Sequence, residues 1–232
     1  MCGRFAMGAD LNDLIEAFVA DGHRFSEWVP RWNIAPTSTI PLVIDLPSTG
    51  ESPERLIGPA RWSLTPSWSP TLELPYPTFN ARSETVGEKP TFRPSLATQR
   101  GLIPAECFYE WHQTGGVKVP YCVRPVTSRF FAFAALYSVW TNPQTQEKTT
   151  TATILTQDAT EPLAWLHDRQ PVMVPESLWS TWLDPTARWT QGEMDRLVEQ
   201  AGEQSAEVEV YQVAPLRGEG PQLMERSSDS PR

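Results

Sequence analysis

Two parts of the chain carry the apolar periodicity of a helix. Asp10 is a good N-cap residue, apolar residues follow it at helical spacing, and Gly22 closes the segment. Thr190 and Glu193 form a capping-box pattern, which opens a second helix on the C-terminal side. A shorter apolar segment that begins after a proline also favours a helix. Helices are therefore predicted at residues 11–19, 176–183 and 191–201.

Most other apolar residues lie in short runs that are rich in β-branched and aromatic side chains, which is typical of strands. Glycine and proline turn signals separate several of these runs, for example at Gly115-Gly116 and Asn142-Pro143. The 23 prolines argue against a helical bundle, because proline removes a backbone donor and breaks helix interiors. An ordered surface loop is expected at residues 65–80. Strands are predicted at residues 40–46, 56–64, 101–112, 117–124, 129–140, 149–156 and 207–213.

The order of these elements predicts one α+β domain with a strand-rich, barrel-like core and flanking helices. The chain has 232 residues, which suffices for a substantial core, and no linker divides it convincingly. The domain is expected to span residues 2–223. Residues 224–232 form a polar tail that is expected to be disordered.

Composition and charge exclude several classes of protein. The sequence contains no phosphate-binding loop, no dinucleotide fingerprint and no metal-ligand spacing, so no cofactor and no metal are predicted. It shows no secretory signal and no apolar run near the roughly 18 residues of a membrane span. Three cysteines do not make a disulfide framework. We therefore expect a cytoplasmic monomer with no membrane partner, and the net charge of −9 disfavours avid non-specific binding of nucleic acid.

The first chemical feature is Cys2, because methionine is generally removed when the second residue is small. A terminal cysteine carries an α-amine that ordinarily titrates at about 7.7–8.0, far below a lysine amine. The neutral amine attacks an aldehyde to form a Schiff base, and the neighbouring thiol can then close a thiazolidine ring. Two alternatives stay open at this point: Cys2 is an incidental small residue, or its thiol is the nucleophile of an amide hydrolase.

Five further segments follow in order and, together with Cys2-Gly3-Arg4-Phe5, resemble the SOS-response-associated peptidase (SRAP) family. The resemblance runs from Cys2 to about Leu223. Each segment is short, but all of them in order are highly specific. They are Trp32-Asn33-Ile34-Ala35-Pro36-Thr37, Asn80-Ala81-Arg82-Ser83-Glu84-Thr85, Leu102-Ile103-Pro104-Ala105, Phe108-Tyr109-Glu110-Trp111 and His167-Asp168-Arg169-Gln170-Pro171.

The resemblance implies a protein that binds abasic sites in single-stranded DNA and forms a covalent thiazolidine crosslink through its mature N-terminal cysteine. It also implies an autoproteolytic activity that could remove Met1. By position, the catalytic residues are Cys2, Asn80, Glu110 and His167. The protein would then be associated with the nucleoid when it is bound to DNA.

Imine formation requires an acid and a base, and the same residues can supply them. Histidine titrates near neutrality, so His167 is expected to protonate the sugar oxygen or the departing hydroxyl. Glu110 would need burial to act as an acid near neutrality, and is expected to position and deprotonate the terminal ammonium. Asn80 offers an amide that suits the terminus or the sugar oxygen. Without the motif, a buried ion pair for Glu110 and a core or capping role for His167 would be the alternatives.

A local DNA-binding groove is expected despite the negative total charge, because arginines accompany the motifs. Arg82 is the strongest candidate for a phosphate contact, and Trp68 is expected to be exposed so that it can stack on a base. Trp140, Trp165, Trp179 and Trp182 are predicted to be core residues. The full set of expected DNA contacts is Arg4, Asn33, Pro36, Trp62, Pro66, Trp68, Arg82 and Arg169.

The sequence departs from the family pattern at a few positions. Cys107 stands where the family usually has glycine, three residues before Glu110, and Ala214 and Gly218 stand where it often has asparagine. Besides the abasic-site sensor, two other functions remain open. One is a thiol peptidase that acts on its own N-terminus or on other proteins, and the other is a non-catalytic module that binds single strands.

Overall fold

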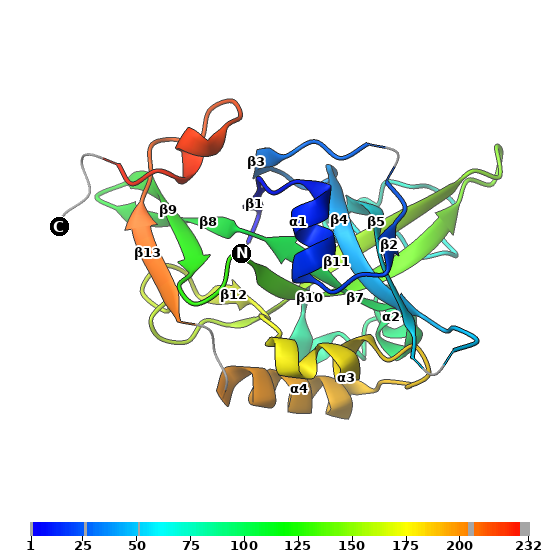
Figure 1. The fold of residues 1–232 in the computed structure, drawn as a ribbon. Coiled ribbons are helices and arrows are strands. Elements are labelled where there is room, and N and C mark those ends of the chain that lie inside the picture. The colour runs from blue at the N-terminus through cyan, green and yellow to red at the C-terminus, as the bar shows by residue number, and fades with distance from the viewer. Residues whose placement is uncertain (1, 26, 51, 204–206, 228–232) are drawn as a thin grey trace.

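A closed barrel of five strands forms the centre of the computed structural model, which describes residues 2–25, 27–50, 52–203 and 207–227. The strand order is β11-β10-β7-β4-β5, and a parallel pairing of Thr151 with Arg61 joins β11 to β5 and closes the ring (Figure 1). The predicted α+β class with a barrel-like core is therefore confirmed. The barrel strands are β4 (Thr39–Leu46), β5 (Glu54–Trp62), β7 (Arg100–Ala105), β10 (Phe131–Thr141) and β11 (Lys148–Asp158).

A second, antiparallel sheet lies beside the barrel in the order β13-β9-β8-β1-β3 (Figure 1). Phe5 of β1 packs edge-on against Trp62 of the barrel, with 5.1 Å between the ring centroids, so the two sheets share one apolar core. Phe133 of β10 completes this aromatic contact. The strands of the second sheet are β1 (Arg4–Met7), β3 (Arg31–Ile34), β8 (Cys107–Thr114), β9 (Val117–Pro125) and β13 (Val208–Gln212).

Three very short strands extend the barrel sheet, and the helices flank it. In Figure 1, α3 and α4 lie together at one end of the molecule. No helix in the described ranges is long and apolar enough to cross a membrane. The short strands are β2 (Gly22–His23), β6 (Asn80–Arg82) and β12 (Arg169–Pro171); the helices are α1 (Leu11–Ala17), η1 (Ser83–Thr85), α2 (Arg93–Thr98), η2 (Glu176–Leu178), α3 (Trp179–Leu183), α4 (Gln191–Glu203) and η3 (Pro221–Met224).

The predicted elements are present with two differences, and the structure adds α2 and the short strands β1, β2, β3, β6 and β12, which were not predicted. Asp10 caps α1 by accepting a hydrogen bond from the Asp13 main-chain nitrogen at 2.9 Å, as predicted. The single strand predicted at 101–112 is in fact β7 and β8, which lie in different sheets. The chain passes between the sheets at Glu106, whose main-chain nitrogen donates to Ala6 of β1. The residues on both sides of Glu106 are buried and strand-like, and one charged residue between them did not mark the break.

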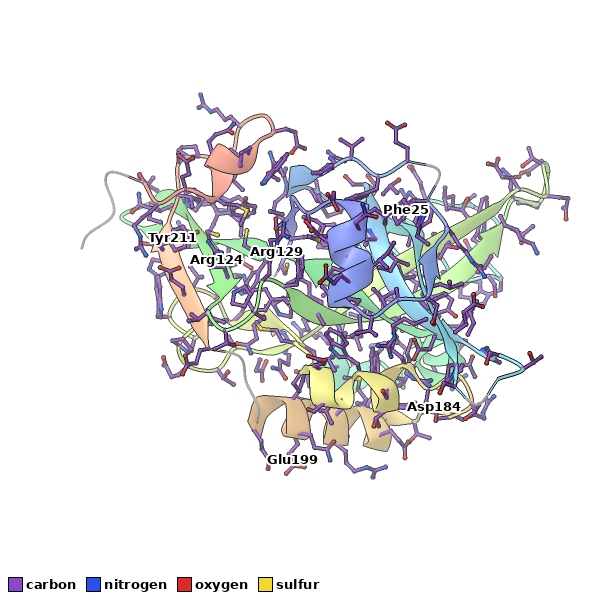
Figure 2. The ribbon with its side chains drawn as sticks, in the orientation of Figure 1. Phe25, Arg124, Arg129, Asp184, Glu199 and Tyr211 are labelled. Carbon is purple, nitrogen blue, oxygen red and sulfur yellow. The ribbon has the colours of Figure 1, made fainter. Side chains whose placement is uncertain are left out.

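The second difference concerns the C-terminal tail. Residues 224–227 pair with the second sheet: Arg226 forms a bridge with Val213, and Met224 accepts a hydrogen bond from the Tyr211 hydroxyl at 2.7 Å. The structured domain therefore continues past the predicted boundary at residue 223. The rest of the predicted tail, residues 228–232, lies outside the described residues. Figure 2 shows Tyr211 close to Arg124 on this sheet.

Candidate functional site

Strand pairing brings the N-terminus to the centre of the molecule. β1 runs antiparallel to β8, with Arg4 opposite Tyr109, so Cys2 lies beside the end of β8 that carries Glu110. β6 runs parallel to β11 and places Asn80 next to Ile154. From there the Asn80 amide donates a hydrogen bond to the Cys2 carbonyl oxygen at 2.8 Å. Residues 2 and 80 are therefore joined directly, so the Asn80 amide holds the terminus, one of the two contacts that its chemistry suits.

The side chain of Cys2 is completely buried. Burial raises the pKa of the Cys2 thiol well above its usual range, and the negative charge of Glu110 raises it further. The thiol group lies 4.0 Å from the Arg4 carbonyl oxygen, as a weak donor. The surroundings of the thiol therefore oppose formation of the thiolate.

Glu110 is also buried, with only 5% of its surface exposed. Burial raises the pKa of the Glu110 carboxyl, and the attraction of His167 acts in the opposite direction without cancelling the rise. Glu110 is therefore buried, as a role in proton transfer near neutrality requires. Its carboxyl holds a proton at higher pH than an exposed carboxyl does. A carboxylate with a raised pKa is also a stronger base.

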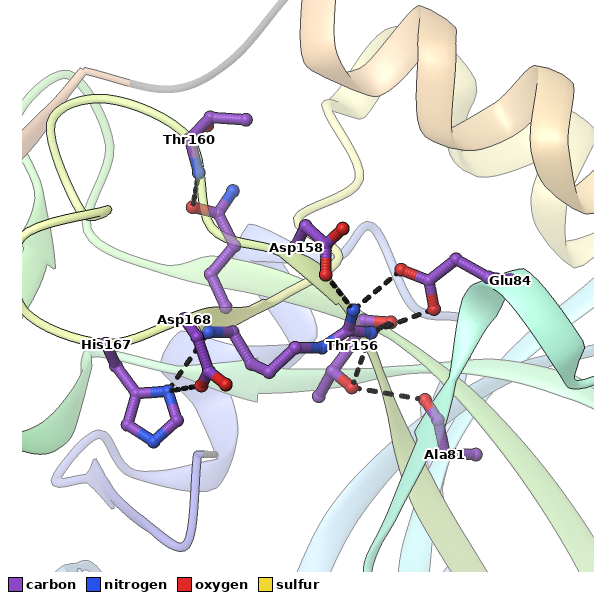
Figure 3. A network of polar contacts seen from close by, with 9 residues as sticks. Ala81, Glu84, Thr156, Asp158, Thr160, His167 and Asp168 are labelled. Carbon is purple, nitrogen blue, oxygen red and sulfur yellow. Dashed lines mark hydrogen bonds and ion pairs between the residues drawn. The ribbon is translucent and has the colours of Figure 1, made fainter.

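His167 lies at the end of a loop of residues 159–168, just before β12. Its Nδ1 accepts a hydrogen bond from the Arg169 main-chain nitrogen at 3.0 Å and lies 2.5 Å from Asp168 Oδ1 (Figure 3). With Nδ1 as an acceptor, the neutral ring carries its proton on Nε2; the protonated ring can instead donate from Nδ1 to Asp168. The surroundings therefore support both protonation states.

Glu110 and His167 face a common cleft of about 760 Å³ between the β8–β9 hairpin and the 159–168 loop. The cleft brings the carboxyl and the imidazole together from segments more than fifty residues apart. Among the described residues, no three histidine, cysteine, aspartate or glutamate side chains cluster as a metal site would require. The cleft is lined by Glu110, Trp111, His112, Gln113, Lys118, Ala164, Trp165, Leu166, His167 and Asp168.

Arg4 and Asn33 contact one another beside the terminus. Arg4 Nη1 donates to Asn33 Oδ1 at 2.5 Å, and Asn33 Nδ2 donates to the Gly218 carbonyl at 3.1 Å. The carboxylate of Glu219 accepts hydrogen bonds from the main-chain nitrogens of Trp32 and Asn33, at 2.8 and 3.1 Å. The C-terminal loop thereby fixes β3 and, through Asn33, orients Arg4.

The other expected DNA contacts divide into exposed and buried residues. Arg82 is exposed on β6, and Trp68 is 59% exposed, as predicted for Trp68. Pro36 is half-buried. Trp62 is fully buried and donates its indole N–H to the Phe79 carbonyl at 2.8 Å, and Pro66 is buried as well. The neighbouring Pro-Trp loop pattern concealed that Trp62 ends a core strand, so neither Trp62 nor Pro66 presents a surface to DNA in this structure.

Arg169 is likewise a buried residue with protein partners. Its guanidinium donates to Glu84 at 2.7 Å, to Asp158 at 2.5 Å and to the Thr156 carbonyl at 2.7 Å (Figure 3). Its charge is thus matched within the fold rather than offered to a phosphate. Through its main-chain nitrogen, the same residue positions His167.

The prediction was wrong for one aromatic residue at the cleft. Trp165 was predicted to be a core residue, but 46% of its surface is exposed and it lines the cleft. Leu163 and Leu166 on either side are the residues that the loop buries. An apolar run within an irregular loop has no fixed period, so the pattern could not separate the anchors from the exposed residue.

Comparison with known proteins agrees with this architecture. The family model for SOS response associated peptidase (SRAP) matches residues 1–217. The abasic site processing protein YoqW of Bacillus subtilis (strain 168) is 36% identical over 189 residues, which cover 80% of this chain and 81% of that protein. The abasic site processing protein HMCES of Xenopus tropicalis is 28% identical over 221 residues, covering 79% of this chain and 66% of that protein.

A solved structure of a protein from Bacteroides thetaiotaomicron has the same fold, with a TM-score of 0.79 at 19% identity; the match covers 97% of this chain and all of that chain. Other proteins thus share the fold that holds this site. The site consists of Cys2, the Asn80 amide on its carbonyl, and Glu110 and His167 in the cleft. The chain belongs to the SOS response associated peptidase (SRAP) family.

Proposed function

We propose that this protein processes abasic sites in single-stranded DNA by forming a thiazolidine crosslink through Cys2, once Met1 has been removed. The observation that carries the proposal is that the Asn80 amide binds the Cys2 carbonyl, while Glu110, which interacts electrostatically with the Cys2 thiol, faces one cleft together with His167. The relatives named as abasic site processing proteins support the same substrate. The expected partner is therefore DNA that carries an aldehyde in its ring-opened sugar.

The reaction begins at the new α-amine. Glu110 takes a proton from the terminal ammonium. Burial raises the pKa of Glu110, which brings it closer to the pKa of the ammonium and makes the transfer less unfavourable. The neutral amine adds to the aldehyde carbon, and His167 donates a proton to the hydroxyl, which leaves as water and gives a protonated imine. The proton on its nitrogen returns to His167 and leaves the neutral imine. The Cys2 sulfur then adds to the imine carbon, its proton passes to the nitrogen, and the ring closes. The balance is one aldehyde and one aminothiol giving one thiazolidine and one water.

The order of the steps differs from that of a thiol peptidase, in which the sulfur attacks first. A peptidase needs a thiolate, and burial beside Glu110 opposes its formation. In the proposed reaction the amine attacks first and the thiol follows as a neutral group. Asn80 fixes the carbonyl of Cys2 and so helps to hold the amine and the thiol in position to attack the same aldehyde carbon.

Exposed side chains near this site are expected to hold the strand. Arg82 lies two residues from Asn80 on β6 and is proposed to contact a phosphate. Trp68, in the loop after β5, is proposed to stack on a base. Arg4, oriented by Asn33, is proposed to contact the strand beside the reactive sugar.

The test is incubation with a single-stranded oligonucleotide that carries one abasic site, followed by a denaturing gel. The wild-type protein should give a heat-stable shifted band, and intact-mass measurement should show that Met1 is absent. Cys2→Ala should form at most a labile Schiff base that borohydride traps, and an N-terminal tag should abolish the stable band. Protein cleavage without a band would instead support a peptidase, and a full yield from Cys2→Ala would exclude the thiazolidine.

A further inference from the structure

Trp165 is an exposed aromatic residue next to the proposed acid. The loop that carries it is closed at its base by a hydrogen bond from the Ala159 main-chain nitrogen to the Asp168 carbonyl at 2.9 Å. Leu163 and Leu166 anchor the loop in the core on either side of Trp165. The indole is therefore presented to the cleft by a loop whose backbone is fixed, two residues before His167.

Two other rings hold the indole in place. His112 of β8 meets it edge-on at 5.3 Å between centroids, and Tyr121 of β9 does so at 5.1 Å. These contacts leave nearly half of Trp165 exposed, on the side of the cleft. An exposed indole that neighbouring rings already orient loses little conformational entropy when a flat ligand stacks on it.

The charges of the cleft indicate which part of a nucleotide this wall accepts. Glu110 and Asp168 are acidic lining residues and Lys118 is the basic one, which gives a formal charge of −1 when both histidines are neutral. Asp168 is 82% exposed at the rim. A phosphate placed against this wall would meet like charge, whereas an uncharged base would not.

We infer that Trp165 forms a stacking subsite for the nucleobase directly next to the abasic sugar. The inference rests on the proposed function, because the position of that base follows from placing the sugar between Cys2 and His167. Stacking there holds the neighbouring nucleotide while the aldehyde faces the terminal amine. Since stacking does not depend on base identity, the subsite is tolerant of sequence.

The test measures the coupling between the indole and one base. Binding of the mature protein is measured by fluorescence anisotropy with a single-stranded oligonucleotide containing one tetrahydrofuran abasic analogue, which has no aldehyde and cannot crosslink. Two further oligonucleotides replace the adjacent nucleotide on the 5′ or the 3′ side with a second tetrahydrofuran. Trp165→Leu keeps an apolar side chain without a ring, and Trp165→Phe retains a smaller ring.

We expect Trp165→Leu to weaken binding of the first oligonucleotide by on the order of tenfold, and by less than about twofold when the base on one particular side is missing. Trp165→Phe should retain most of that coupling. Equal affinity of Trp165→Leu and wild-type protein, or the same loss whichever base is removed, would overturn the inference. A thermal unfolding curve of each variant shows whether the fold is intact.

Crosslinking by wild-type protein separates this inference from the proposed function. If wild-type protein crosslinks an aldehyde-bearing site but Trp165 shows no coupling, only the subsite is wrong. If the coupling is present and no crosslink forms, the subsite stands and the covalent chemistry fails. Absence of any single-strand binding by the wild-type protein would overturn both.

Discussion

Arg100 and Glu110 are both buried in strands, yet their surroundings differ completely. Arg100, at the start of β7, is 4% exposed and donates five hydrogen bonds, all to main-chain carbonyls around α2 and α3. The rings of Trp182 and Trp189 lie over its guanidinium at 5.9 and 5.2 Å. Burial lowers the pKa of Arg100 to about 10, which leaves it charged at neutral pH. It connects a barrel strand to the helices that cover one end.

Glu110 has different surroundings, in which its Oε1 accepts a hydrogen bond from the Trp111 main-chain nitrogen at 3.4 Å. It belongs to the second sheet, faces an open cleft and interacts electrostatically with the thiol of Cys2 and the ring of His167. Burial raises the pKa of Glu110 toward neutrality, whereas Arg100 stays charged at neutral pH. A buried charge surrounded by carbonyls stabilises the fold, whereas a buried carboxyl beside a cleft and two titratable groups is available for proton transfer.

The largest effect on stability should come from replacing Arg100. Arg100→Leu should lower the free energy of unfolding by at least about 3 kcal/mol, because it leaves several buried carbonyls without a donor. The control is Arg129→Leu: Arg129 lies on the surface beside α1 (Figure 2), is half exposed, and pairs with Asp13 and Glu106. That variant should lose less than about 1 kcal/mol. Urea unfolding measures both, and similar losses would end the contrast between the two regions.

A second pair of arginines tests the same contrast within the motifs. Arg169→Ala should lower the free energy of unfolding by about 2 kcal/mol, since Arg169 is buried among Glu84, Asp158 and Thr156. Arg82→Ala should change it by less than about 0.5 kcal/mol.

Single-strand binding at several salt concentrations should give the reverse order for the two arginines. Arg82→Ala should reduce the slope of log affinity against log salt by roughly one phosphate equivalent, and Arg169→Ala should leave the slope unchanged. A reduced slope for Arg169→Ala would mean that its guanidinium leaves the ion pairs when DNA binds.

The sequence predicted the long elements and the exposure of Trp68, but not the burial of Trp62 and Arg169. Helix α1 follows from its helical periodicity, and strand β4 follows from a long run of β-branched and other apolar residues. β1, β6 and β12, which carry the motifs, span only three or four residues and show no period. Their positions depend on pairing with distant strands, which local pattern does not encode. Arg82 and Arg169 look alike in sequence, and Arg169 is buried only because the fold places it against β11 and beside Glu84.

The third prediction concerns the cost of burying Glu110. Because its folded pKa is raised, its contribution to stability is full below the ordinary carboxyl value of 4.5 and is lost as the pH rises through the raised pKa. Glu110→Gln keeps a neutral side chain, so it should raise the free energy of unfolding at pH 8 by on the order of 1 kcal/mol and give no gain below pH 4. Thermal unfolding at both pH values measures this. A loss of stability at pH 8 would show that the carboxylate is well solvated by its partners.

The same variant should slow crosslinking, most strongly at low pH, where the terminal amine is otherwise protonated, and should recover as the pH rises. His167→Ala should show the opposite trend: slowest at pH 7–8, where acid is scarce, and partly rescued at lower pH. Crosslinking rates from pH 5 to 9 compare the two profiles. Coincident profiles would show that Glu110 and His167 do not divide the proton transfers as proposed.

A small effect on stability is also expected from Glu219, a surface residue that binds the main chain of β3. Its carboxylate is 44% exposed, so Glu219→Ala should lower the free energy of unfolding by less than about 1 kcal/mol. Yet it fixes the main chain at Trp32 and Asn33, and Asn33 orients Arg4, so crosslinking should slow severalfold. Glu209→Ala is the matched control, because Glu209 forms an exposed ion pair with Arg226 on the far strand of the same sheet. If both variants crosslink at the wild-type rate, Arg4 does not need the C-terminal loop. A severalfold loss for Glu219→Ala alone would show that, unlike the Arg100 region, this region is oriented by partners that contribute little to folding.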